Sequence, residues 1–219
     1  HDRKNPVAVK PSYRSEFSAM ISVLAFDLAK NRTGWAVGKP DIMDKGKAGW
    51  GVFEPEPGDN MEHVTLGNFA RLLQDLHKRH EITHIVWEKL FVDLNPQKFQ
   101  FNGTRGQIHL EGVLLAYCGL HDINPSDVAI STWRKATYGT AKAQPNEGGK
   151  LEDGYWKKLA LSWAASHGYT VAYHDEAEAL AILWWALGQL DTRFAGWSDP
   201  IFRRNDLHAM FRRGIHVET

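Results

Sequence analysis

Four acidic side chains stand out because each lies at the end of a predicted strand or near the start of a predicted helix. They are Asp27, Glu88, Asp175 and Glu178. Carboxylates brought together raise one another's pKa values, and a divalent cation placed among them relieves the repulsion. Oxygen ligands without cysteine suit Mg²⁺ or Mn²⁺, and two such ions can clamp the attacking and leaving oxygens of a phosphodiester. These residue types therefore indicate hydrolysis by a metal-activated water that leaves a 5′-phosphate.

The first two acids each end a short apolar run. Residues 21–26 have the sequence ISVLAF before Asp27, and residues 82–87 have the sequence ITHIVW before Glu88. An apolar run bounded by polar residues is typical of a buried strand. Residues 59–79, between the runs, carry apolar side chains at helical spacing, and a strand–helix–strand order predicts parallel pairing. Glu88 is therefore expected beside Asp27, although an acid that ends a strand can also be a simple turn cap.

The other two acids are three residues apart at the start of a long predicted helix. Residues 174–178 have the sequence HDEAE, and an almost uncharged stretch follows to about residue 190. Such a helix must be largely buried, and residues three apart on a helix lie on one face. Asp175 and Glu178 can therefore point together at the sheet. The alternative is that both acids are there because the helix dipole favours carboxylates near a helix N-terminus.

The remaining pattern predicts one α/β domain with a mixed central sheet flanked by helices. Further elements are expected as strands at 33–38 and 46–53, a helix at 104–120 with Ile108 on its buried face, a strand at Val128-Ala129-Ile130, a loop at 139–153 and a helix at 154–167. The first three strands should form an antiparallel meander, with the later strands parallel. The domain is expected to span 20–195. Residues 1–19 are assigned to an N-terminal arm or a remnant before the true start, and 196–219 to a basic C-terminal tail.

The composition limits the class of protein. The chain has 219 residues, enough for one full-sized domain, with 43% hydrophobic and 24% charged residues as in ordinary globular proteins. No stretch approaches the roughly 18 apolar residues of a membrane span, and no apolar segment typical of a secretory signal is seen. The single cysteine, Cys118, excludes a disulfide framework and is expected in the core. A cytoplasmic location is the simplest expectation.

The local sequences around the acids resemble the RuvC family of Holliday junction resolvases, within the RNase H-like nuclease superfamily. The segments DLAKNRTG at 27–34, EKLF at 88–91 and DEAEALAI at 175–182 are similar to three motifs of that family. The resemblance covers about residues 21–190. This chain has Leu28-Ala29 where the family usually has Pro-Gly, and Glu178 where it usually has Asp. The chain therefore looks like a divergent member, of bacterial or phage origin.

The resemblance implies an RNase H-like fold and a metal-dependent endonuclease that resolves four-way (Holliday) junctions by paired symmetric nicks. The four acids would hold two Mg²⁺ ions, with Mn²⁺ as a substitute. A homodimer would match the two-fold symmetry of the junction, each subunit cutting one strand. The implied location is the cytoplasm of a bacterium or of a phage-infected host cell.

The resemblance also implies contacts to DNA. The candidate DNA-binding residues are Phe91, Lys135, Lys142, Arg134, Arg105 and Gln107. Phe91 would stack on a base near the branch point, which contributes about 1–3 kcal/mol per base. Lys135 and Lys142 would contact phosphates near the cut, and His174 could assist at the metal. The ordinary alternatives are a phenylalanine at the edge of the core, lysines on a solvated face and a histidine near a helix cap.

Three other functions compete with junction resolution. A debranching or flap endonuclease without junction specificity would be compatible with Leu28-Ala29 and with the long loop at 139–153. A nucleic-acid-binding protein with weak catalysis is possible on this fold, but four intact acids argue against it. An ATPase of the actin and sugar-kinase type also begins with a strand that ends on an aspartate. That class needs further glycine-rich phosphate loops, which this sequence lacks.

Overall fold

The structure is a computed structural model that describes residues 21–40, 48–55, 62–90, 101–143 and 153–190, with only the backbone described for 101–103. Its elements, in chain order, are β1 (Val23–Asp27), β2 (Thr33–Gly38), β3 (Gly49–Phe53), α2 (Glu62–His80), β4 (His84–Glu88), α3 (Phe101–His121), β5 (Asn124–Val128), α4 (Ile130–Tyr138), α5 (Tyr155–Ser166) and α6 (His174–Leu190). Within the described residues, no helix is long and apolar enough to cross a membrane.

The strands form one mixed sheet in the order β3-β2-β1-β4-β5. The pairs β1–β2 and β2–β3 are antiparallel, and the pairs β1–β4 and β4–β5 are parallel. The predicted meander and the predicted parallel crossover are both confirmed. Phe26 pairs with Trp87 across β1 and β4. The next residues along, Asp27 and Glu88, therefore end the two strands at the same edge of the sheet.

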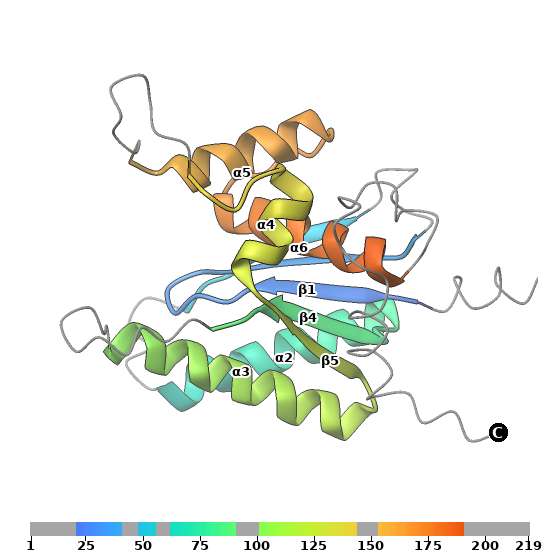
Figure 1. Ribbon diagram of the computed structural model, residues 1–219. Helices are drawn as coiled ribbons and strands as arrows, with labels where there is room; N and C mark the ends of the chain where they lie inside the picture. Colours follow the sequence, from blue (N-terminus) through green and yellow to red (C-terminus); the bar gives the residue numbers. More distant parts are fainter. Residues whose placement is uncertain (1–20, 41–47, 56–61, 91–100, 144–152, 191–219) are drawn as a thin grey trace, which may run out of the picture.

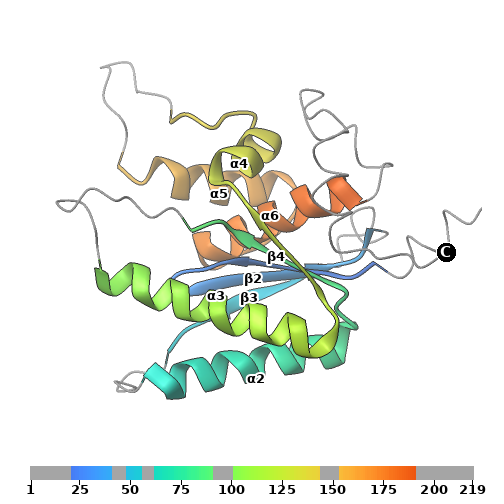
Figure 2. The same ribbon diagram turned by 60° about the horizontal axis from the view of Figure 1, so that its bottom comes forward.

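Two helical layers cover the sheet, α2 and α3 on one face and α4, α5 and α6 on the other (Figures 1 and 2). Alternate residues of β1 face opposite layers, as the strand period requires. Val23 and Ala25 pack in the core with α6, whereas Leu24 and Phe26 pack with α2 and α3. The helix α6 is buried along most of its length, as its uncharged sequence predicts. Cys118 is buried in the core, as expected.

Two predictions about individual elements are wrong. The last strand, β5, is Asn124–Val128 rather than 128–130, and Ile130 begins α4. This strand lies at the edge of the sheet, where polar residues and Pro125 are tolerated because one side of the strand needs no partner. Ile108 does not lie on the buried face of α3, since it is 49% exposed. The central part of the predicted loop, 144–152, lies outside the described residues.

Candidate active site

The turn after Asp27 is fixed by two side chains. The Thr33 hydroxyl donates to the Ala29 carbonyl oxygen at 2.9 Å and accepts a hydrogen bond from the Ala29 N–H at 3.3 Å. The Gln107 amide donates to the Leu28 carbonyl oxygen at 2.7 Å. The Leu28 side chain is buried in the core between the sheet and helices α2 and α3. The Leu28-Ala29 pair therefore anchors the turn to the core.

Gly34 is required by the close approach of α6 to the sheet. It pairs with Asp27 across β1 and β2. A Cβ atom at residue 34 would lie 2.0 Å from the carbonyl oxygen of Asp175, far inside any allowed contact. Only glycine therefore lets the first turn of α6 reach the end of β1. The two residues of the Thr-Gly sequence therefore have different structural roles. Thr33 closes the turn through its hydrogen bonds, and Gly34 allows α6 to pack close to the sheet.

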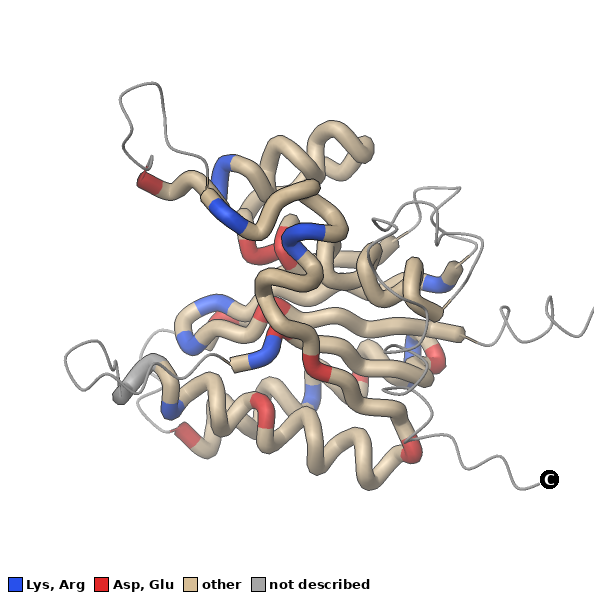
Figure 3. The backbone as a smooth tube through the Cα atoms, viewed as in Figure 1, with Lys and Arg blue, Asp and Glu red and all other residues tan. Residues whose placement is uncertain are grey.

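The structure brings the four predicted acids together, where charged residues gather at one end of the sheet (Figure 3). Burial raises the pKa of Asp27 well above its usual value, and the charges of Glu178, Glu88 and Asp175 raise it further. The carboxyl groups of Asp27 and Glu178 lie close enough for each to shift the pKa of the other. Burial raises the pKa of Glu88 to about 7, although Arg134 and the Trp133 indole oppose that rise. The predicted convergence of carboxylates from β1, β4 and α6 therefore exists in the fold.

Helix α4 supplies hydrogen-bond donors to two of these acids. The Arg134 guanidinium (Nη2) lies 3.0 Å from Oε1 of Glu178. The Trp133 indole N–H donates to Oε2 of Glu88 at 2.9 Å. Burial raises the pKa of Glu178, and Arg134 opposes that rise more than any other group. The two glutamates are therefore held by protein donors from a helix that carries none of the four acids.

The Asp175 carboxylate has fewer close polar partners than the two glutamates have. Its Oδ1 lies 3.5 Å from Nε2 of His174, and its Oδ2 lies 3.8 Å from Nη1 of Arg32. Oδ2 is buried and has no hydrogen-bond partner. Arg32 is also paired with Glu54 and lies 3.8 Å from the ring centre of Tyr173. A buried carboxylate oxygen without a partner is costly, and it indicates a place where a further ligand belongs.

The four acids fit a divalent metal ion by their chemistry. All their donors are carboxylate oxygens, one of which is buried and unpartnered, and their mutual repulsion is what a cation would neutralise. In their present positions, however, no three His, Cys, Asp or Glu side chains of the described residues are arranged to ligate one ion. Glu88 and Glu178 each give one carboxylate oxygen to a donor from α4.

The predicted DNA-binding residues are distributed unevenly around this cluster. Arg134 lies inside it. Arg105 forms an ion pair of 3.1 Å with the acid that begins α2, and Gln107 binds the turn after Asp27. Lys135 is partly exposed on α4 and Lys142 is exposed beyond it, while Phe91 lies outside the described residues. Their contacts with DNA remain predictions.

The sequence interpretation did not single out Arg32, Trp133 and Tyr138. The Tyr138 hydroxyl is buried without a hydrogen-bond partner, and the pKa of this group is raised first by burial and then by the charge of Glu178. Arg32 lies within the first motif, so its proximity to the acids could have been inferred. Trp133 and Tyr138 carry no such signal, because an aromatic residue on a short helix normally indicates only core packing.

Comparison with known proteins supports the fold. No protein-family model matches the chain, and no curated protein matches it in sequence. RuvC of T. thermophilus in complex with a Holliday junction substrate superposes with a TM-score of 0.56 at 16% identity, covering 82% of this chain and 99% of that one. A second Thermus thermophilus RuvC structure gives a TM-score of 0.51 at 16% identity with the same coverage. The yeast mitochondrial Holliday junction resolvase Ydc2 gives 0.46 at 15% identity, covering 85% and 83%. The two RuvC superpositions and the strand order together show that the chain has the RNase H-like α/β fold of RuvC.

Proposed function

We propose that this protein is a metal-dependent DNA endonuclease that resolves four-way junctions by paired symmetric nicks. The observation that carries the proposal is the convergence of four carboxylates from β1, β4 and α6 at one end of the sheet. The fold supports it, because the superposed RuvC structure was determined with a Holliday junction substrate. Carboxylates that repel one another away from bulk water have a cost in stability, which a site for catalysis would explain.

The residues proposed to hold two Mg²⁺ ions, or Mn²⁺, are Asp27, Glu88, Asp175 and Glu178. When bound, such ions activate a water and stabilise the charge on the attacking and leaving oxygens of a phosphodiester. The protein's own contribution is to hold the carboxylates in position. The Thr33 bonds fix the turn that carries Asp27, and Gly34 allows Asp175 to lie beside it. Cleavage would leave a 5′-phosphate and a 3′-hydroxyl.

Substrate preference tests the specificity of the proposed reaction. We expect a four-way junction to be cut at least about 100-fold faster than a linear duplex of the same sequence, a difference of roughly 2.7 kcal/mol. The measurement compares initial rates on a junction, a Y-fork, a flap and a duplex in Mg²⁺. Equal rates on forks, flaps and junctions would instead favour the debranching nuclease, and binding without any cleavage would favour a nucleic-acid-binding protein.

We also propose a homodimer that forms through α3. Three large apolar side chains of this helix are exposed: Ile108 at 49%, Leu115 at 48% and Leu120 at 80%. Gly112 and Gly119 lie on the same stripe as Ile108 and Leu115, and the space around both glycines is open. Such a stripe would allow two copies of α3 to approach closely, and α3 lies at the outer surface of its layer (Figure 2). A two-fold dimer would present two active sites to a two-fold substrate.

Replacing Leu115 with Glu should weaken dimer formation by about 100-fold or more, because it would bury a charge at the centre of the proposed interface. Sedimentation velocity across a range of protein concentrations measures the dissociation constant, and circular dichroism checks folding. The matched control is Leu161→Glu on α5, since Leu161 is 38% exposed in the opposite layer. A Leu115→Glu protein that dimerises as well as the wild type would place the interface elsewhere, and a monomeric wild type would refute the homodimer.

A further inference from the structure

Arg134 is held inside the carboxylate cluster on three sides. Its side chain is only 14% exposed, and its Nη2 lies 3.0 Å from Oε1 of Glu178. The guanidinium carbon lies 4.3 Å from the ring centre of Trp156 and 5.2 Å from that of Trp133. Its Nε is buried and has no hydrogen-bond partner. The two indoles therefore hold a planar cation against one glutamate, and its buried Nε donor is unpaired.

Arg134 is the most deeply buried arginine that faces these acids among the described residues. The other is Arg32, whose side chain is 34% exposed and whose charge is shared with Glu54. Arg134 contacts Glu178 directly, and its positive charge also acts on Glu88. Arg134 thus supplies positive charge to two of the four converging carboxylates.

We propose that Arg134 is a built-in counter-cation that a divalent ion must displace from Glu178. The proposal rests on the proposed function, because it takes Glu178 as a metal ligand. A divalent ion bound to Glu178 would lie within a few ångströms of the guanidinium, and like charges at that distance repel strongly in a partly buried site.

The displaced guanidinium would remain near the cut, because Trp156 and Trp133 flank it. Its donors, including the Nε that is now unpaired, would be free for a phosphate oxygen of the bound DNA. DNA would then stabilise the displaced position and so tighten metal binding, and metal would tighten DNA binding by the same factor. Arg134 would thus act as a positioning residue for Glu178 in the free protein and would link metal loading to the substrate.

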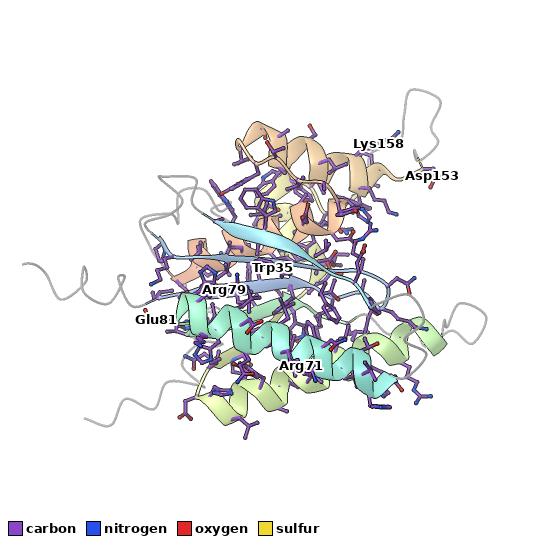
Figure 4. The ribbon with its side chains drawn as sticks, turned by 180° about the vertical axis from the view of Figure 1, so that it is seen from behind. Trp35, Arg71, Arg79, Glu81, Asp153 and Lys158 are labelled. Carbon is purple, nitrogen blue, oxygen red and sulfur yellow. The ribbon has the colours of Figure 1, made fainter. Side chains whose placement is uncertain are left out.

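Calorimetric titration with Mn²⁺ at pH 8, without DNA, tests the proposal. Arg134→Gln should bind Mn²⁺ about tenfold more tightly than the wild type, because the competing cation is gone. Arg134→Lys keeps the charge but loses the planar guanidinium group. It should bind Mn²⁺ about threefold more tightly than the wild type. The matched control is Arg71→Gln, which removes the same charge from an exposed arginine of α2 and should leave Mn²⁺ affinity unchanged (Figure 4). In a Glu178→Gln background, removing Arg134 should have no effect.

An unchanged or weaker Mn²⁺ affinity in folded Arg134→Gln overturns the role of Arg134. If that variant lacks the native circular dichroism spectrum, the Mn²⁺ affinity of Arg134→Lys is measured instead. An unchanged or weaker affinity of that variant would likewise overturn the role of Arg134. If neither the wild type nor any variant binds Mn²⁺, the proposed metal site itself fails. If the wild type binds Mn²⁺ and cuts junctions while both Arg134 variants match its affinity, the proposed function stands and the counter-cation role is refuted.

Discussion

Replacing Asp27 with Asn should abolish cleavage of a four-way junction in Mg²⁺ and leave junction binding nearly unchanged. Asp27 lies at the centre of the cluster, since the charges of Glu178, Glu88 and Asp175 all act on it. Asparagine keeps the shape of the side chain but lacks the negative charge that holds a cation. We expect the cleavage rate to fall at least about 1000-fold, a loss of roughly 4 kcal/mol of transition-state stabilisation. Single-turnover cleavage measures this loss, and a gel-shift titration in Ca²⁺ measures binding.

The same substitution should stabilise the metal-free protein at pH 8. Burial and three neighbouring acids raise the pKa of Asp27, so its ionised form is disfavoured by folding. A neutral amide at this position removes that penalty, and the free energy of unfolding in urea with EDTA should rise by about 1–2 kcal/mol. The control is Asp153→Asn, an exposed carboxylate near the start of α5 that should give no gain (Figure 4). A lower stability for Asp27→Asn than for the wild type would show that Asp27 is not strained by its neighbours.

The wild type should show the matching pH dependence. Folding raises the pKa of Glu88 from 4.5 to about 7. Between these values the folded protein holds a proton that the unfolded chain releases, so the contribution of this group to stability is greatest below about pH 5, falls as the pH rises toward 7 and is fully lost above about pH 7. The loss from Glu88 alone should be on the order of 3 kcal/mol, and bound Mg²⁺ should reverse part of it. Urea unfolding at pH 5 and 8, with and without Mg²⁺, measures both effects.

Replacing Gly34 with Ala should disrupt both the fold and the site. The added Cβ would lie 2.0 Å from the Asp175 carbonyl oxygen, and a backbone atom cannot yield as a flexible side chain would. Either the first turn of α6 moves away from β2 or the sheet distorts, and in both cases Asp175 moves away from Asp27. We expect the free energy of unfolding to fall by about 3 kcal/mol and junction cleavage to fall with it.

Gly67→Ala is the matched control for this substitution. Gly67 lies within α2, and a Cβ there would have no atom within 4 Å. Alanine in a helix interior is more favourable than glycine, so stability should rise by about 0.5–1 kcal/mol. Urea unfolding midpoints of the two variants give the comparison. A Gly34→Ala protein as stable and active as the wild type would mean that α6 does not depend on this close approach.

The elements that carry the four acids were predictable, because each has a strong local signal. The apolar runs that end on Asp27 and Glu88 are short and bounded by polar residues, which is how a strand covered on both faces appears in sequence. The uncharged stretch after Glu178 leaves little alternative to a buried helix. The parallel pairing of β1 and β4 followed from the helix between them, and it placed two acids at one edge of the sheet.

The surroundings of the acids were not predictable, because they depend on contacts between distant segments. Trp133 and Arg134 reach Glu88 and Glu178 from 45 and 44 residues away, and nothing in the sequence of α4 indicates which way they point. The edge strand β5 was misplaced because its residues are mostly polar, whereas the apolar stretch that follows it leads into α4. Gln107 is a candidate DNA contact only through the family resemblance. Its bond to the Leu28 carbonyl becomes visible only when α3 is placed beside the turn.

Cleavage of a synthetic four-way junction, with each strand labelled in turn, tests the central proposal most directly. In Mg²⁺ the wild type should nick two opposite strands at symmetric positions and leave 5′-phosphates that a ligase can reseal. Added EDTA should stop the reaction, and Asp27→Asn should yield no product under the same conditions. Cleavage that persists in EDTA, or that proceeds at the normal rate in Asp27→Asn, would contradict the assignment of the four carboxylates as a metal-dependent active site.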